Sequence, residues 1–93
     1  MLTVTEAASA RLAEMLKQQD VPADIAVRFV HEGEGVGLRP DNEREGDTAF
    51  QHEGRTVLLL DAQVSELLVD DTLDVEDAKL TLRHPKEGDS RQQ

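Results

Sequence analysis

A short segment rich in glycine, HEGEGVG at residues 31–37, places polar side chains where they could do chemistry. His31 and Glu32 stand at its mouth, and Glu34 lies inside it. Imidazole and carboxylate groups together suit zinc or ferrous iron. The segment directly follows a strand-like stretch, and loops held by a rigid scaffold often carry function. It is therefore the first candidate site.

Two further histidines, His52 and His84, lie on predicted strands that could converge on this segment. The spacing forms no metal motif, because neither HxH nor HxxxH occurs and the three histidines are twenty or more residues apart. A metal site would need the fold to bring the ligands together. The alternative is that His31, His52 and His84 lie at strand ends and face water or the backbone. They are weak candidates for metal ligands, and we predict no metal and no other cofactor.

The glycines do not form a phosphate-binding loop. The motif GEGVG differs from GxGxxG, lacks the Gly-Lys-Ser/Thr ending, and is followed by Arg39-Pro40 rather than by a helix. Turns explain the glycines better, because glycine adopts the positive φ angles that a chain needs when it leaves a sheet and returns.

The residues that enzymes use as nucleophiles are missing or poorly placed. The chain has no cysteine, which excludes disulfides, thiolate catalysis and thiolate metal sites. Ser9 and Ser65 fall in helical patterns without a nucleophile elbow. The adjacent carboxylates of Asp70 and Asp71 are more typical of a turn than of an acid and base pair. We predict that the protein is not an enzyme.

Charge limits the class of partner. Twenty acidic residues against ten basic ones give a formal net charge of −10, which repels nucleic-acid phosphates and anionic lipid head groups. The start of the chain lacks the pattern of a signal peptide, and no apolar run approaches the roughly 18 residues of a membrane span. We expect a soluble cytoplasmic protein with no nucleic-acid or membrane partner. The acidic surface supports solubility, and adaptation to a high-salt cytoplasm is the alternative.

These residues must be positioned by a single small domain. Its first element is a predicted amphipathic helix that ends near Gln19, ahead of Pro22. Thr3 and Thr5 both precede this helix, and the segment Thr3-Val4-Thr5-Glu6 has the spacing of a capping box. The inner face of the helix is predicted to consist of Ala8, Leu12, Met15 and Leu16.

Strands follow the helix. Residues 25–30 alternate as a strand does, and residues 39–47 read as a polar connection rich in turn formers. Residues 48–52 and 55–61 then form a predicted hairpin around the turn Glu53-Gly54. The unbroken apolar run from Val57 to Leu60 indicates the central, most buried strand.

The last third of the chain contains a second helix and two more strands. Asp61 can cap a helix over residues 62–70, with Val64, Leu67 and Leu68 predicted to face the core. Residues 73–76 and 80–83 alternate as strands. The domain is expected to span residues 1–85, and residues 86–93, which contain no apolar side chain, are expected to form a flexible tail.

From Leu2 to Pro85 the whole sequence resembles the HesB/IscA-like A-type iron-sulfur carriers. The most specific part is the ordered set between Glu45 and Asp77: a strand, a turn with Gly54, a strand ending in Asp61, a short Leu-Leu helix and a further strand. The resemblance implies a compact, β-rich α+β domain with mostly antiparallel strands and two helices packed on one side.

The resemblance also implies three cysteine ligands, and this sequence has none of them. The first would fall in the glycine cluster, where this chain carries Gly35. The remaining pair would fall near Glu87-Gly88-Asp89. The degenerate ligand loop consists of Gly33, Glu34, Gly35, Val36 and Gly37.

Iron-sulfur clusters need soft thiolate donors, and carboxylates do not replace them. We therefore expect a non-enzymatic binding or interaction module related to iron-sulfur cluster assembly proteins. Its expected partner is an assembly component or a second copy of the chain in a homodimer. The alternative is a protein that binds iron or zinc through histidine and carboxylate side chains.

Overall fold

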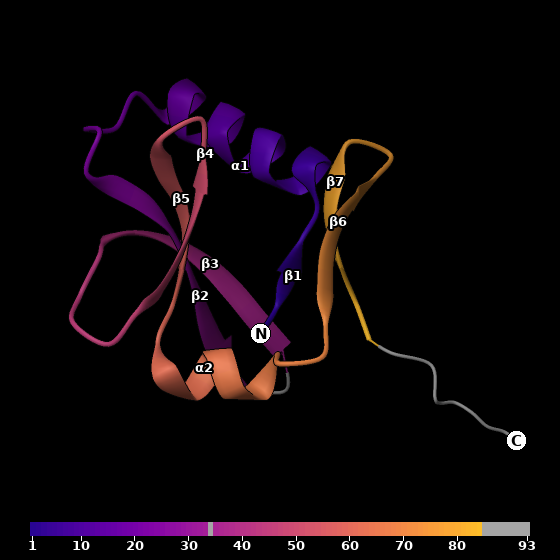
Figure 1. Cartoon of the computed structure of the whole chain (residues 1–93). Coiled ribbons are helices and arrows are strands. Elements are labelled where there is room, and N and C mark those ends of the chain that lie inside the picture. The colour runs from indigo at the N-terminus through magenta and orange to yellow at the C-terminus, as the bar shows by residue number, and fades with distance from the viewer. Residues whose placement is uncertain (34, 85–93) are drawn as a thin grey trace, which may run out of the picture.

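A computed structural model describes residues 1–33 and 35–84 of the chain (Figure 1). The helices are α1 (Glu6–Gln19) and α2 (Ala62–Leu67), and the strands are β1 (Thr3–Val4), β2 (Ile25–Glu32), β3 (Gly35–Asn42), β4 (Thr48–His52), β5 (Arg55–Leu60), β6 (Thr72–Glu76) and β7 (Lys79–Arg83). Within the described residues the strands form a four-stranded sheet, β3-β2-β5-β4, and a three-stranded sheet, β1-β6-β7. The pairs β1-β6 and β2-β5 are parallel, and the other pairs are antiparallel.

Both helices contribute to one hydrophobic core between the two sheets. In Figure 1, α1 runs along the top, the four-stranded sheet lies to the left, the three-stranded sheet lies to the right, and α2 closes the bottom. The core joins side chains from every layer: Leu12, Leu16, Val27, Phe29, Leu58, Val64 and Leu73 are among its members. The predicted α+β fold class, with mostly antiparallel strands, is confirmed. Neither helix in the described residues has the length and apolarity needed to cross a bilayer.

Helix α1 begins one residue after Thr5, which is its N-cap. The Thr5 hydroxyl accepts a hydrogen bond from the backbone N–H of Ala8 at 3.1 Å. The prediction that Thr3 caps the helix is wrong, because Thr3 lies in β1 and pairs with Thr72 of β6. The predicted end at Gln19 is confirmed.

The hairpin of β4 and β5 forms as predicted. Glu53 and Gly54 both have positive φ angles, 52° and 82°, which is typical of two-residue hairpin turns. Strand β5 lies between β2 and β4, and Val57–Leu60 have no exposed surface. The apolar run therefore marks a central strand.

Strand β3 replaces the first part of the polar connection predicted at residues 39–47. It pairs with β2 along its full length, from Gly35 opposite Glu32 to Asn42 opposite Ile25. Pro40 is compatible with this pairing because β3 is an edge strand, where a missing N–H breaks no central hydrogen-bond ladder. The prediction of a loop was wrong because it relied on local turn formers.

Helix α2 is shorter than predicted. Asp61 caps it as expected, accepting a hydrogen bond from the N–H of Val64 at 2.8 Å, but the helix ends at Leu67. Val64 and Leu68 are buried, whereas Leu67 is 56% exposed. The predicted inner stripe is therefore wrong at Leu67.

The chain then forms a second hairpin from β6 and β7. Asp77 and Ala78 make its turn with φ angles of 52° and 66°. Residues 85–93, which include the predicted tail at 86–93, lie outside the described residues, so the predicted domain boundary stays a proposal.

A buried ion cluster holds the connection between β3 and β4 against the sheet. Arg28 of β2 is 5% exposed. Its Nη1 and Nη2 donate to the carboxylate of Asp47 at 3.0 and 2.6 Å, and its Nε donates to Asp41 at 2.8 Å. The hydrogen bonds from Arg28 are the main cause that lowers the pKa of Asp47 below its usual value. A paired and hydrogen-bonded guanidinium can thus remain charged inside the molecule.

Candidate functional site

The glycine cluster forms the tip of the hairpin between β2 and β3. Strand β2 ends at Glu32, Gly33 turns with a φ of 57°, and β3 begins at Gly35. Gly35, Val36 and Gly37 of the degenerate ligand loop are therefore strand residues rather than loop residues. Glu34 lies outside the described residues. Positive φ explains Gly33, as predicted, but not Gly37.

Gly37 has a different physical reason. A Cβ atom built there would lie 2.9 Å from Cδ of Glu32. The missing side chain lets Glu32 cross the hairpin, where its Oε2 accepts a hydrogen bond from Nη2 of Arg39 at 3.2 Å. Because both side chains are exposed, this ion pair contributes little stability.

A groove of about 290 Å³ lies between the hairpin, α2 and the end of β7. Its apolar lining comes from all three elements: Val36, Leu67, Leu68 and Leu82. His31, Asp71 and His84 supply the polar lining. Val36 follows Gly35, the position that the resemblance gives to the first cysteine. His84 follows β7, beyond which the resemblance places the other two. The groove therefore lies next to the position that the resemblance gives to the first cysteine, and the positions of the other two lie outside the described residues.

Two of the three histidines that are candidate metal ligands line this groove. His84 Nδ1 lies 2.9 Å from Oδ2 of Asp71, whose side chain is 8% exposed. His31 lines the same groove from β2. His52 lies elsewhere, in a hollow against α1, with its Nε2 3.9 Å from Glu53. In residues 1–33 and 35–84, no group of three or more histidine, aspartate or glutamate side chains is arranged to hold a metal ion.

Sequence reasoning missed Asp71 and Leu67 as groove residues. The pair Asp70-Asp71 read as a solvated turn, but only Asp70 is exposed, and Asp71 is buried beside His84. The signal that could have revealed Leu67 is the double leucine Leu67-Leu68. Adjacent helical residues point about 100° apart, so a short helix seldom buries both.

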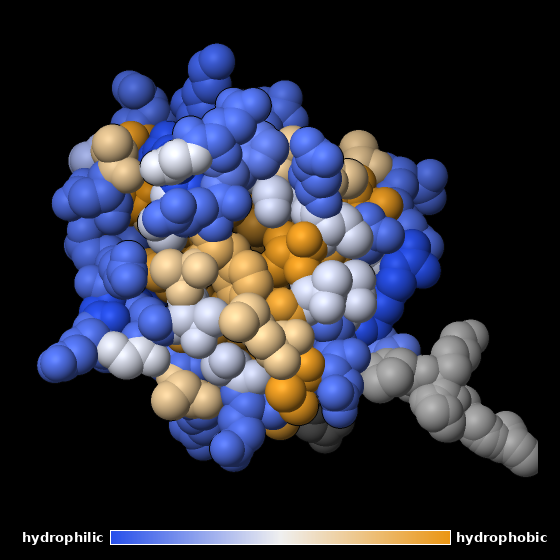
Figure 2. All heavy atoms as spheres, viewed as in Figure 1, coloured by the Kyte–Doolittle hydropathy of each residue, from blue (hydrophilic) through white to orange (hydrophobic). Residues whose placement is uncertain are grey.

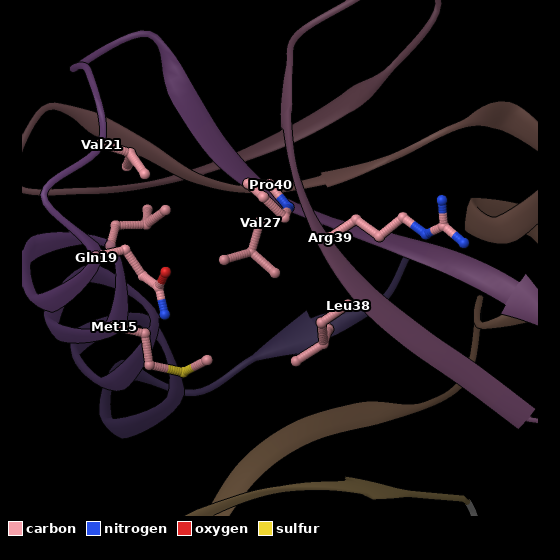
Figure 3. Close-up of a pocket in the computed structure, with 8 residues that line it drawn as sticks. Met15, Gln19, Val21, Val27, Leu38, Arg39 and Pro40 are labelled. Carbon is pink, nitrogen blue, oxygen red and sulfur yellow. The ribbon is translucent and has the colours of Figure 1, made fainter.

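A second apolar hollow of about 170 Å³ lies beside α1. Figure 3 shows Met15 from α1, Val27 from β2 and Leu38 from β3 with their side chains directed toward this space. Leu38 is 41% exposed. The hollow contains Arg39 and Gln19 as its polar groups, so it could hold an apolar side chain but offers no catalytic pair.

The fold has known relatives among solved structures. SufA from Escherichia coli, which is involved in the biosynthesis of iron-sulfur clusters, matches with a TM-score of 0.60 and 23% identity over 88% of this chain and 81% of its own. The chain has the fold of SufA. A protein from Aquifex aeolicus, solved by solution NMR, matches with a TM-score of 0.64 and 19% identity over 90% of this chain and 91% of its own. No protein-family model and no curated protein sequence matches the chain.

The SufA-like fold confirms the resemblance that the sequence indicated, at the level of fold. The conclusion extends to the order and arrangement of elements, because the match covers most of both chains. It does not extend to activity, because one scaffold hosts different sites. Any argument about the activity of this chain must therefore start from the side chains in its own groove.

Proposed function

We propose that the protein is a non-enzymatic, cytoplasmic interaction module with a SufA-like fold, related to iron-sulfur cluster assembly but unable to ligate a cluster. The observation that carries the proposal is the combination of a SufA-like fold with a chain that has no cysteine. Its partner would be a component of iron-sulfur assembly or a second copy of the chain.

Donor chemistry excludes a cluster of the usual kind. Iron-sulfur clusters are held by thiolates, and even histidine-containing sites keep cysteines on one iron. Dimerisation does not change this, because two cysteine-free chains still supply no thiolate. The groove offers two imidazoles, one carboxylate and apolar side chains instead.

The architecture nevertheless keeps a surface on which a partner could dock. The groove is lined mainly by apolar residues, and Leu67 at its edge is 56% exposed. Apolar surface that remains exposed favours association with another protein. We therefore propose that the protein binds partners without handling clusters.

Reconstitution with ferrous iron and sulfide tests the loss of cluster binding. The chain has no Trp, Tyr or Cys, so absorbance near 280 nm or in the visible would report a bound species. We expect a colourless protein without acid-labile sulfide after desalting, while a ferredoxin treated in parallel turns brown. A stoichiometric, redox-active cluster on this chain would overturn the proposal.

Direct binding tests the interaction role. Purified cysteine desulfurase and scaffold proteins from the same cell would be titrated into the chain by calorimetry. We expect saturable binding of at least one of them, with bovine serum albumin as the negative control. Binding of none of them would contradict the link to iron-sulfur assembly.

The alternative function, binding of zinc or iron, rests on His31 and His84 lining one groove, although no three ligand side chains among residues 1–33 and 35–84 are arranged around a common metal position. Imidazole and carboxylate ligands suit zinc or iron, and Asp71 already contacts His84. Elemental analysis of untagged protein would detect a bound metal. Stoichiometric zinc or iron that is lost in the variant His31→Ala/His84→Ala, but kept in His52→Ala, would support this alternative over the first.

A further inference from the structure

We propose that α2 and the adjacent groove dock a protein segment that carries apolar anchor residues flanked by lysine or arginine. This inference rests on the proposed function as an interaction module and specifies its surface and partner chemistry. We define the α2 surface as His31, Val36, Glu66 and Leu67, which line the hollows beside α2, together with the exposed Val69 and Asp70, which follow α2 in the chain.

Exposed apolar side chains mark this surface. Leu67 is 56% exposed and Val69 is 45% exposed, although the sequence pattern predicts that Leu67 faces inward. Leu67 borders two hollows, the groove beside His31 and Val36 and a second hollow of about 450 Å³ that also includes Glu66. An apolar side chain inserted in either hollow would therefore contact Leu67.

The space-filling view agrees with a surface of mixed character. Figure 2 shows apolar residues in the middle of the view, where the N-terminus and β1 lie in Figure 1, and further apolar residues at the lower end, near α2, with hydrophilic residues beside them. Such a patch, rimmed by polar residues, is typical of protein interaction sites.

Charge selects the partner. Residues 61–71, which include α2 and the turn after it, contain four aspartate and glutamate residues and no lysine or arginine. Glu66 and Asp70 are both exposed. Within the described residues, neither forms an ion pair with a cation of the chain. A basic segment would supply the missing counter-charges and would be steered toward the surface.

Other occupants fit less well. A second copy would bring the same carboxylates face to face, which costs electrostatic energy. The chain's own last residues, KEGDSRQQ, contain no apolar anchor. Anionic lipid head groups are repelled by the negative charge.

The test is NMR titration of the ¹⁵N-labelled full chain with a synthetic amphipathic peptide of leucine and lysine. Two matched peptides carry glutamate in place of lysine or serine in place of leucine. We expect the leucine-lysine peptide alone to shift the amides of residues 63–71, His31 and Val36. The variant Leu67→Ser, which lacks the apolar contact, should bind the leucine-lysine peptide about tenfold more weakly. The matched control Leu38→Ser, on β3, should change binding by less than about twofold.

Charge is tested separately. The variant Glu66→Gln/Asp70→Asn should weaken binding about fivefold, more than Glu14→Gln/Asp20→Asn elsewhere on the surface. Shifts that map to another face, unchanged affinity in Leu67→Ser, or equal binding of the leucine-glutamate peptide would overturn the inference. Concentration-dependent shifts of the same amides without peptide would also overturn it, because they would make a second copy the occupant.

The two proposals can fail independently. If an assembly protein binds the chain and Leu67→Ser does not weaken that binding, the interaction role is supported and the proposed α2 surface is contradicted. If the peptide binds the α2 surface but no assembly protein binds the chain, the surface stands and the link to iron-sulfur assembly falls.

Discussion

Arg28 places a full positive charge inside a small domain. The charge is retained because Asp47 accepts two hydrogen bonds from its guanidinium and Asp41 accepts a third, with the carbonyl oxygen of Asn42 accepting a fourth. Removing one partner of such a pair leaves an uncompensated charge, which is far more costly than the pair is stabilising.

We therefore expect Asp47→Asn to lower the free energy of unfolding by about 3 kcal/mol. Urea unfolding followed by circular dichroism measures this change. The matched control is Glu76→Gln, which also removes one negative charge but breaks an exposed pair with Arg83. That control should cost less than about 1 kcal/mol, and equal costs for the two variants would contradict the importance of burial.

The same cluster predicts how stability depends on pH. The pKa of Asp47 is lowered, mainly by hydrogen bonds from Arg28, and that of Asp41 is lowered by the backbone N–H of Asn42 and then by Arg28. An unfolded aspartate has a pKa of about 3.9, so both groups stabilise the folded chain fully above that value. As the pH falls further toward the folded pKa, the unfolded chain takes up protons first and the stabilisation is lost.

Urea unfolding between about pH 6 and about pH 2.5 tests this prediction around the unfolded pKa. The free energy of unfolding should fall more steeply below about pH 4 in the unmodified chain than in Asp47→Asn, because the variant lacks one of the titrating groups. Parallel curves would show that other carboxylates cause the acid sensitivity.

At the scale of elements, helix α1 is tied to the three-stranded sheet by one threonine. The Thr5 hydroxyl caps the helix and donates a hydrogen bond to Oδ1 of Asp74 on β6 at 2.9 Å. The backbone N–H of Thr5 also donates to the carbonyl oxygen of Leu73. The cap thus fixes the point at which α1 leaves β1 and begins to cross the core.

We expect Thr5→Ala to lower the free energy of unfolding by about 1 to 2 kcal/mol, because the cap and the bond to Asp74 are lost together. Thermal or urea unfolding gives the value. Thr3→Ala, at the exposed residue of β1, is the control and should change stability by less than about 0.5 kcal/mol. If Thr3→Ala lowered the free energy of unfolding more than Thr5→Ala, the assignment of Thr5 as the N-cap would be wrong.

For the whole molecule, the net charge of −10 is spread over a domain with a radius of gyration of 13.6 Å. Like charges this close repel one another, and folding increases the repulsion because the chain becomes compact. Salt shortens the range of this repulsion to about 10 Å at 0.1 M. Stability at neutral pH should therefore depend on ionic strength.

We expect the free energy of unfolding to rise by about 1 kcal/mol when NaCl increases from about 0.02 M to about 0.5 M. Thermal unfolding at several concentrations checks the rise. KCl at equal ionic strength is the control and should act identically if screening is the cause. A fall in stability would mean that favourable ion pairs outweigh the repulsion.

The parts that could be predicted from the sequence are those with local signals. The β4-β5 hairpin follows from a turn with Gly54 between two apolar runs, and the buried strand β5 follows from its uninterrupted apolar residues. Strand β3 was missed because Pro40 and its polar neighbours favour a turn locally. Only pairing with all of β2, a non-local interaction, makes this segment extended.

The sequence by itself determined which donors this protein can offer, because a chain without cysteine has no thiolate in any conformation. It also determined the negative charge and the amphipathic first helix. Tertiary structure alone decided that Arg28 is buried and that His31 and His84, but not His52, share a groove with Leu67. The reason is physical: composition sets the available chemistry, whereas proximity depends on contacts between segments far apart in the chain.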